Sequence, residues 1–327
     1  MDNTKVRLAY ILSASHSGST LLAMLLGAHP ELVTVGELKA TALGDPDSYL
    51  CSCRSRIREC EFWRAITQRM EKRGVTFDVT NAGTDLRSEA TPYVKRLLKP
   101  LHHGPLLEAL RDAALACSGA WRRKLPRIQA LNYALMASVL EQTGRAVIVD
   151  SSKIGIRLKY LLRTTGLDVR VIRLVRDGRG VALTYLDPGQ FADASEPSLR
   201  GGGTGTAPLP ARRSMAEAAE EWRRSNEEAE AVLARLERSQ WMQVQYERLC
   251  AEPTATIASI CSFLGVDPGA TVLDFRSRPH HIIGNGMRLD SVGVIRLDER
   301  WKAELSPSDL NVFQAVAGTM NRRLGYL

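Results

Sequence analysis

The chain has 327 residues, of which 44% are hydrophobic, so it can bury the core of one large α/β domain or two small ones. Its 44 basic and 36 acidic residues leave a net charge of +8, which suits an anionic substrate. The arginines are spread over predicted helices, which favours a solvated basic surface over nucleic-acid binding. The sequence shows neither a signal peptide nor a transmembrane run, and we therefore expect a cytoplasmic protein.

The first 30 residues predict a strand, a turn of small residues and a helix. Residues 6 to 12 form a short apolar run typical of a buried parallel strand, and residues 20 to 28 are helix formers. The turn between them reads Ser-Ala-Ser-His-Ser-Gly-Ser-Thr. Such a loop directs backbone N–H groups, hydroxyls and the positive end of the helix dipole toward one point. The sequence therefore predicts an anion-binding site, with a plain strand-turn-helix junction as the alternative.

The register of this loop indicates which anion it can hold. Compared with the nucleotide-binding pattern G-x-x-x-x-G-K-[ST], the loop keeps Gly18 and Thr20 but places Ser13 and Ser19 at the first glycine and the lysine. It can hold a 5′-phosphate, but it lacks the cation that steadies a transferring γ-phosphate in kinases and ATPases.

Two charged residues are expected at the edge of the sheet where a ligand would bind, one after a turn and one after a strand. Pro30 and Gly36 bracket a turn that leaves Glu37 where open α/β sheets gather their ligands, so Glu37 is a candidate base. A solvated or helix-capping glutamate fits that stretch equally well. A second strand, expected at 146–150, leads to Lys153, which could reach a phosphate held by the first loop. An ordinary lysine at a helix start would oppose the helix dipole, which favours the functional interpretation.

A second phosphate site is predicted after the third strand, which we expect at 169–175. Arg176 ends this strand, and Thr184 follows it eight residues later, about two helical turns along. A guanidinium offers the forked donors that suit a phosphate. Two separate phosphate sites suggest a nucleotide that is phosphorylated at both ends.

The rest of the chain is expected to belong to the same single domain, residues 1–327. Residues from about 45 to 145 predict a helical insertion, with helices at 61–73, 92–99, 104–117 and 126–143. Residues from about 187 to 213 are rich in Gly, Pro, Ala and Ser and predict a mobile loop, either a lid or a disordered excursion. A fourth strand is expected at 242–245.

Three cysteines cluster before the helix expected at 61–73. Cys51, Cys53 and Cys60 are separated by one and by six residues, which does not fit the paired C-x2-C spacing of zinc sites. No fourth ligand is evident in the sequence. We therefore interpret this segment as a structural loop, with redox sensitivity left open, in preference to a metal site.

Together these motifs resemble those of the PAPS-dependent sulfotransferases, where PAPS is 3′-phosphoadenosine-5′-phosphosulfate, and the resemblance covers nearly the whole chain. SHSGSTLL is similar to the family's 5′-phosphosulfate loop, and RLVRDGRGVALTY is similar to its 3′-phosphate motif. The group that contains tyrosylprotein sulfotransferases and many bacterial members is the most similar. Its catalytic base aligns with Glu37, and its lysine after the second core strand aligns with Lys153. One departure is His16, which stands where the family usually has Lys or Arg.

The resemblance implies an α/β, P-loop-like three-layer fold with a central parallel sheet of four or five strands between helices. It also implies in-line transfer of the sulfuryl group from PAPS to a hydroxyl of a small molecule, glycan or lipid, without a metal. Glu37 takes the acceptor proton, and Lys153 and His16 stabilise the leaving group. The residues expected to bind the nucleotide are His16, Ser17, Gly18, Ser19, Thr20, Arg176, Thr184 and, more weakly, Arg288.

Two other functions remain open at this point. A P-loop kinase or nucleotidase would need Mg²⁺ and a lysine in the loop, and Ser19 argues against it. A non-catalytic nucleotide-binding protein would have no need of Glu37 and Lys153 beside the loop.

Overall fold

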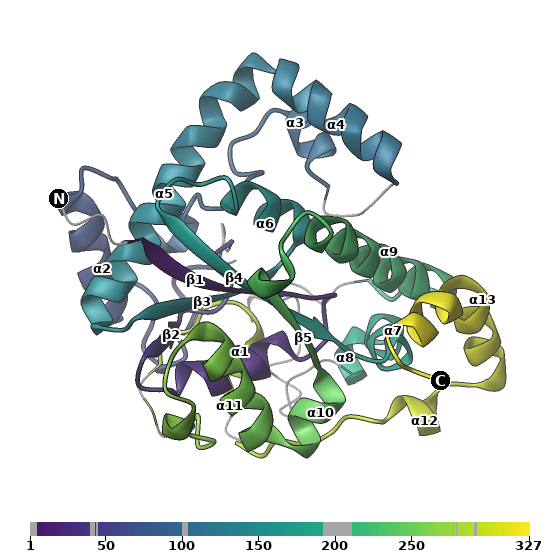
Figure 1. Cartoon of the computed structure of the whole chain (residues 1–327). Coiled ribbons are helices and arrows are strands. Elements are labelled where there is room, and N and C mark those ends of the chain that lie inside the picture. The colour runs from purple at the N-terminus through teal and green to yellow at the C-terminus, as the bar shows by residue number, and fades with distance from the viewer. Residues whose placement is uncertain are drawn as a thin grey trace.

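The computed structural model describes residues 5–39, 43, 45–99, 104–191, 211–276, 278, 280–290 and 293–327. At its centre lies a parallel five-stranded sheet in the order β2-β3-β1-β4-β5 (Figure 1). The strands are β1 Val6–Leu12, β2 Leu32–Thr34, β3 Val147–Lys153, β4 Leu167–Val175 and β5 Trp241–Gln245. This confirms the predicted parallel sheet. The loop expected at 187–213 falls mostly outside the described residues.

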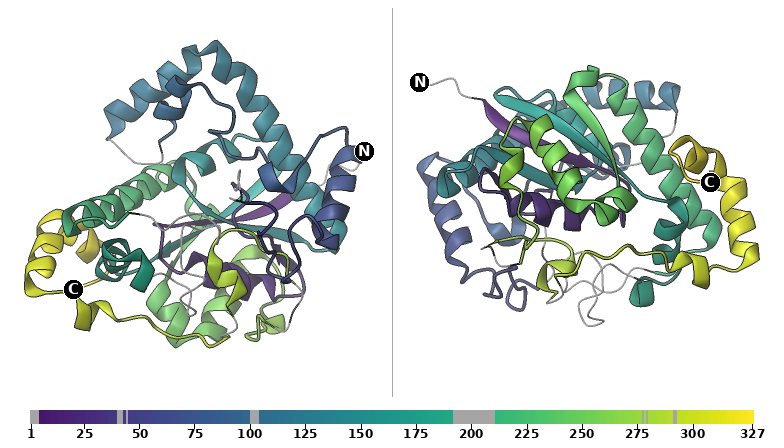
Figure 2. Two further views of the ribbon diagram at one scale, coloured as in Figure 1. Left: turned by 180° about the vertical axis from the view of Figure 1, so that it is seen from behind. Right: turned by 60° about the horizontal axis from the view of Figure 1, so that its bottom comes forward.

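Helices cover both faces of the sheet, which gives the predicted three layers (Figures 1 and 2). One face packs against α1 Ser19–Gly27, α10 Tyr246–Ala251 and α11 Pro253–Leu264. The other packs against α2 Glu61–Lys72, α5 Gly119–Thr143, α6 Gly155–Leu161 and α9 Met215–Leu233. Beyond the sheet, α7 Gly178–Leu186 and α13 Pro307–Arg323 pack on α9, while α3 Pro92–Leu97 and α4 Pro105–Cys117 pack beside α5 and α6. Two short helices, α8 Pro188–Phe191 and α12 Trp301–Glu304, complete these elements.

The side chains of β1 show why this strand is central. Leu8 and Tyr10 are buried against α5 and α6 on one face, while Ala9 and Ile11 are buried against α1 on the other. A strand buried on both faces has a continuous apolar sequence, which is why its bounds could be predicted from the sequence.

Two elements differ from the sequence-based expectation. The turn expected between Pro30 and Gly36 contains β2, a strand of three residues on the edge of the sheet. The helix expected from residue 126 begins at Gly119, because the hydroxyl of Ser118 accepts the N–H of Trp121 at 3.3 Å and caps the helix there. Pro126 is therefore inside α5.

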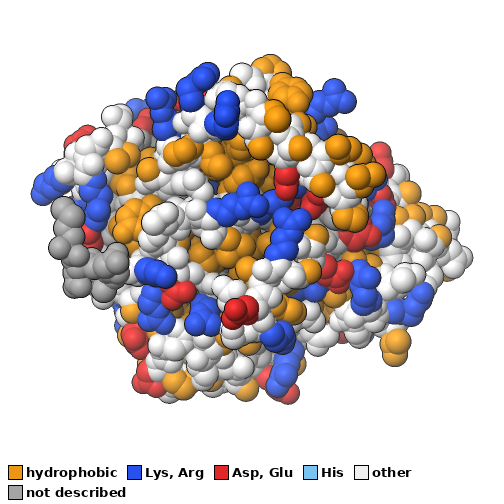
Figure 3. Space-filling view, turned by 45° about the horizontal axis from the view of Figure 1, so that its top comes forward, with side chains coloured by type: hydrophobic (Ala, Val, Ile, Leu, Met, Phe, Trp, Pro, Cys, Tyr) orange, Lys and Arg blue, Asp and Glu red, His pale blue; other side chains and the backbone are white. Residues whose placement is uncertain are grey.

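The surface shown in Figure 3 carries scattered Lys and Arg side chains among hydrophobic and acidic ones, and no continuous basic surface. Among the described residues, no helix combines the length and the apolar character needed to cross a membrane.

Candidate functional site

Most of the predicted site residues lie where parallel strands end, at one edge of the sheet. The loop of residues 13–18 follows β1, Glu37 follows β2, Lys153 ends β3, and Arg176 follows β4. Two hydrogen bonds connect them: Ser13 N–H donates to the Lys153 carbonyl at 3.3 Å, and Arg176 Nη1 donates to the His16 carbonyl at 2.8 Å. The structure therefore brings the loop, Lys153 and Arg176 together, as the carboxyl edge of a parallel sheet should.

The loop has left-handed backbone angles and two buried hydroxyl groups that lack a hydrogen-bond partner within the described residues. His16 and Gly18 have φ angles of 61° and 85°, in the left-handed region. A side chain at Gly18 would also collide with Tyr246, because an added Cβ would lie 2.5 Å from its ring. The hydroxyls of Ser13 and Ser17 are buried, and no partner for either is found among the described residues. Buried hydroxyls without partners are rare, and they fit a site that a ligand completes.

The start of α1 supports this interpretation. The helix begins at Ser19, and its N-cap is Gly18, which has no side chain to bond the first N–H groups. These donors and the positive end of the helix dipole point toward the same loop as the hydroxyls of Ser13 and Ser17. The loop therefore offers several hydrogen-bond donors to one region, which makes it a candidate anion site.

Glu37 and Lys153 form an ion pair, although they follow different strands. Lys153 Nζ donates to Glu37 Oε1, and Lys39 Nζ lies 3.3 Å from Oε2 of the same carboxylate. Burial raises the pKa of Glu37, but the two ammonium groups outweigh burial and hold the pKa at about 2. Glu37 is therefore ionised and a weak base while both lysines face it.

A buried network holds these two residues in place. The carboxylate of Asp150 accepts the backbone N–H groups of Leu38 at 3.2 Å and of Ser152 at 2.9 Å, and it pairs with Arg157 at 3.3 Å. The hydroxyl of Ser152 accepts the N–H of Lys39 at 3.0 Å. Since these bonds fix the backbone on both sides of the ion pair, they position Glu37 against Lys153. Lys153 itself, at the end of β3, has a φ of 70°, in the left-handed region that is strained for residues other than glycine.

Arg176 lies beside the loop but is already engaged by protein groups. Its Nη2 donates to the carboxylate of Asp298 at 2.9 Å, and its guanidinium lies 4.5 Å from the ring centroid of Tyr246. Burial raises the pKa of the Asp298 carboxyl, but hydrogen bonds and charge from Arg300 and Arg176 lower it well below its usual range. A carboxylate therefore already sits on the guanidinium that was predicted to bind a phosphate.

The remaining predicted residues make local contacts. The buried hydroxyl of Thr184 lies 3.3 Å from the Phe191 carbonyl, which it can donate to. Arg288 donates to the carbonyls of Gly284 at 2.6 Å and of Leu50 at 2.9 Å. These bonds link the segment around residue 288 to the cysteine loop, the segment from Cys51 to Cys60 that precedes α2. The imidazole of His16 packs edge-on against Tyr185, with ring centroids 5.0 Å apart.

Three residues of this region were missed by the sequence analysis. Lys39 shares the Glu37 carboxylate, Tyr246 packs on Gly18, and Asp298 pairs with Arg176. Tyr246 comes directly after β5, so its place at a strand end was a usable signal. Asp298 lies in an aperiodic segment, where no such signal was present.

Comparisons with known proteins agree with the predicted family. Residues 128–268 match the model of a family described as the sulfotransferase family. This segment contains Lys153, Arg176 and Thr184, whereas the loop after β1 and Glu37 precede it. The comparison with curated proteins returned no match.

Several solved structures are similar to this chain. The sulfotransferase domain of the Synechococcus PCC 7002 olefin synthase is 18% identical with a TM-score of 0.49, covering 100% of this chain and 98% of that one. Sulfotransferase STF9 from Mycobacterium avium is 10% identical with a TM-score of 0.48, covering 98% and 78%. Mouse sulfotransferase SULT7A1, complexed with PAP, is 11% identical with a TM-score of 0.40, covering 99% and 86%.

Proposed function

We propose that the protein transfers the sulfuryl group of PAPS to a hydroxyl of an acceptor, because residues 128–268 match the model of the sulfotransferase family. The observation that carries this proposal is the Glu37–Lys153 ion pair at the edge of the sheet where the anion loop also lies. A group that can accept a proton and a cation that can stabilise a leaving oxygen are the two aids that this transfer needs.

The residues around the loop fit the phosphosulfate end of the nucleotide. The hydroxyls of Ser13 and Ser17, which have no partner within the described part of the chain, and the first N–H groups of α1 offer donors to its oxygens. When bound, PAPS supplies the activated sulfuryl group. His16 lies in the same loop and adds a cation there only when its imidazole is protonated.

Lys153 and Glu37 have linked tasks in this proposal. While Lys153 faces Glu37, the pKa of the carboxylate is held near 2, and the carboxylate has little affinity for a proton. An anion in the neighbouring loop competes for the same ammonium group. Once Lys153 turns toward that anion, Glu37 loses a cation but stays buried, so its pKa rises and it can take the acceptor proton. One movement of Lys153 thus stabilises the leaving oxygen and activates the base.

Arg176 is assigned to the 3′-phosphate of the nucleotide, with Thr184 on the helix that follows it. In the structure the Asp298 carboxylate accepts from this guanidinium, so the position suits an anionic group. When the nucleotide binds, its 3′-phosphate takes the place of the Asp298 carboxylate on the guanidinium of Arg176. Arg288 contributes by holding the segment opposite Glu37, because the Gly284 carbonyl that it binds lies in that segment.

The acceptor in this proposal is a small molecule, a glycan or a lipid with a hydroxyl group, and the reaction takes place in the cytoplasm. A screen of such acceptors with labelled PAPS tests the proposal directly. We expect label to move to at least one hydroxyl compound with release of PAP. Failure of PAPS and PAP to bind in calorimetry, or transfer of phosphate from ATP in the presence of Mg²⁺, would overturn it.

A further inference from the structure

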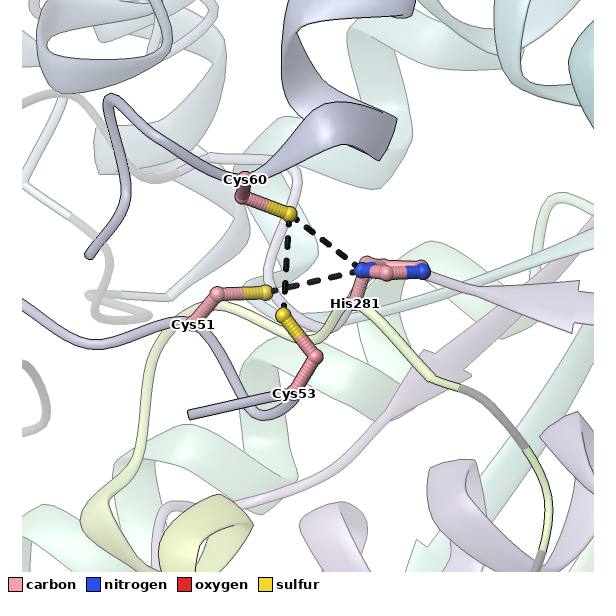
Figure 4. Close-up of side chains that lie close together, drawn as sticks. All are labelled: Cys51, Cys53, Cys60 and His281. Atoms are coloured by element: carbon pink, nitrogen blue, oxygen red, sulfur yellow. Dashed lines mark hydrogen bonds between the residues drawn. The ribbon is translucent and has the colours of Figure 1, made fainter. Parts of the chain in front are cut away.

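Four potential metal ligands, none of them among the proposed reaction-site residues, converge in one place (Figure 4). Their ligand atoms all lie within 4.8 Å of one another. The members of this cysteine–histidine cluster are Cys51, Cys53, Cys60 and His281. The three cysteines come from the loop that precedes α2, whereas the histidine comes from the segment that follows α11. The fourth ligand that the sequence did not reveal is thus supplied by a residue 221 positions beyond Cys60.

The distances agree with the edges of a coordination tetrahedron. Zinc bonds of about 2.3 Å to sulfur and about 2.0 Å to nitrogen give edges of about 3.8 Å between sulfurs and about 3.5 Å between sulfur and nitrogen. In the structure, the sulfurs of Cys53 and Cys60 are 3.7 Å apart. Nδ1 of His281 lies 3.8 Å from the sulfur of Cys51 and 3.3 Å from that of Cys60. One ion at the centre would therefore reach its ligands with little movement.

The sulfurs are not used in disulfides. All six cysteines of the chain are free thiols, and a separation of 3.7 Å is well beyond the length of about 2.05 Å of a disulfide bond. Cys51 and Cys60 are at most 1% exposed. Cys53 is exposed and His281 is partly buried, so an ion could enter the cluster from that side. Three thiols and an imidazole form only weak hydrogen bonds with one another, whereas a metal ion would bind all four groups at once.

Contacts around the cluster orient its ligands. The ring of His281 stacks on Phe62, with centroids 4.4 Å apart and planes within 2°. Ser52, between two of the cysteines, accepts the N–H of Ile282 at 2.7 Å through its hydroxyl, and its own N–H donates to the Ile282 carbonyl at 3.2 Å. These bonds fix the cysteine loop beside His281 independently of the sulfurs. Supporting contacts that hold ligands in place are typical of metal sites.

We propose that the cysteine–histidine cluster binds one Zn²⁺ ion as a structural Cys3His site. Four protein ligands close the coordination sphere and leave no position for a substrate, which is the arrangement of structural rather than catalytic zinc. This replaces the interpretation of the cysteines as a simple structural or redox-sensitive loop. The proposal stands apart from sulfuryl transfer, because it depends only on these four residues and their supports.

The site would stabilise the wall next to Glu37. The N–H of Ile283 donates to the Val35 carbonyl at 2.9 Å, just before Glu37. A Cβ added to Gly284 would lie 3.4 Å from Cγ of Glu37, so this segment passes directly beside the carboxylate. The ion would join the cysteine loop to this segment and hold it there. Its loss should therefore lower the stability of the protein.

Metal analysis of the full chain, purified without chelators, is the first test. We expect about one zinc per chain, as a single four-ligand site requires. At a chelator concentration that leaves the wild type loaded, Cys53→Ser should lose its zinc, whereas Cys117→Ser, which changes an exposed cysteine on α4, should keep it. Retention of zinc by Cys53→Ser under these conditions would overturn the assignment of this ligand and hence the proposal.

A second measurement does not require a variant. Wild-type protein stripped of metal and given Co²⁺ should show the intense visible absorption of tetrahedral cobalt bound to thiolates, and Zn²⁺ should abolish it. Zinc well below one per chain together with no such absorption would overturn the proposal. So would mass spectrometry that finds a Cys53–Cys60 disulfide in the protein as isolated, which would support the redox-sensitive loop instead. Each readout is independent of PAPS turnover, so failure of one proposal leaves the other testable.

Discussion

Lys153 and Glu37 are 116 positions apart in the chain, yet the ammonium of one donates directly to the carboxylate of the other. The pair exists because β2 and β3 are neighbouring parallel strands, so the residues that follow them meet at one edge of the sheet. The ammonium group of Lys153 holds the pKa of Glu37 low, so the position of Lys153 decides how strongly Glu37 can bind a proton. The first two predictions follow from this coupling.

The first prediction concerns the base. Glu37→Gln keeps the shape of the side chain but removes its affinity for a proton, so turnover should fall about a hundred- to ten-thousand-fold. The affinity for PAP should change little, because the loop and Arg176 are left intact. Turnover is measured with labelled PAPS and an acceptor found in the screen. Normal turnover of the Gln variant would rule out Glu37 as the base and leave His16 as the next candidate.

The second prediction concerns pH dependence. Lys153→Met removes the cation that contributes most to lowering the pKa of Glu37, while burial of the carboxyl remains. The pKa of Glu37 in the free enzyme should therefore rise from about 2, and the acidic limb of the kcat/KM profile for PAPS, which reports on the free enzyme, should move to higher pH in the variant. The residual rate of the variant is measured across the acidic range.

A matched control is available for this experiment. Lys39→Met removes the second ammonium from the same carboxylate, 3.3 Å away, but Lys39 has no proposed part in stabilising the leaving oxygen. It should move the acidic limb in the same direction while costing much less turnover at its optimum. Equal losses of turnover in both variants would contradict the separate task given to Lys153.

The parallel sheet and its helical layers could be predicted from the sequence, but the short edge strand β2 and several partners of the candidate site residues could not. The bounds of β1 could be predicted because both of its faces are buried. The positions of residues at strand ends, such as Lys153, followed from the predicted parallel sheet. The partners brought by the distant, aperiodic C-terminal segment could not be predicted. Asp298 and His281 reach their partners through tertiary contacts that no local spacing encodes.

The third prediction concerns the binding of the 3′-phosphate by Arg176. Arg176→Lys keeps a positive charge but loses the forked donors, and Arg176→Ala loses both. Loss of a charge-assisted phosphate contact should cost about 2 kcal/mol, or about a thirtyfold weaker affinity for PAP in the Ala variant. Arg170→Ala, at the other end of β4, is the control. Unchanged PAP affinity in Arg176→Ala, measured by calorimetry, would remove this residue from the site.

The fourth prediction tests the exchange of Asp298 for the phosphate. Asp298→Asn removes the negative charge that pairs with Arg176 at 2.9 Å but keeps a similar shape. If a phosphate takes the place of this carboxylate, the variant should bind PAP more tightly than the wild type, and more so at low salt because the competing interaction is ionic. Weaker binding of PAP by Asp298→Asn would show that Asp298 orients Arg176 rather than competing with the ligand.

The last prediction concerns stability, and it rests on a buried carboxyl group. Glu228 on α9 is 4% exposed, and its Oε1 accepts the N–H of Ile156 at 2.9 Å, near the start of α6. Burial raises its pKa, and the charge of Arg111 and the hydrogen bond from Ile156 only partly oppose this effect, so that the pKa is about 7. The group therefore keeps its proton in the folded protein at pH values where the unfolded chain has lost it.

The sign of the pH dependence follows from this difference. Below pH 4.5, the ordinary pKa of the group, both states hold the proton and its full stabilising contribution is present. Between pH 4.5 and about 7 the unfolded chain binds fewer protons, so the free energy of unfolding falls as the pH rises. Glu228→Gln still accepts the Ile156 N–H through its amide oxygen but cannot ionise. Relative to the wild type, it should gain on the order of 2 to 3 kcal/mol between pH 4.5 and pH 8.

Urea unfolding of both proteins at a series of pH values measures this difference. Subtracting one pH profile from the other removes the contribution of every other titrating group that the two proteins share, so the remaining curve reports on Glu228. Glu217→Gln, on the same helix but at an exposed position of its first turn, should give a flat difference curve through this pH range. A flat curve for Glu228→Gln as well would mean that this carboxyl is ionised in the folded protein at neutral pH, paired with a cation such as Arg111.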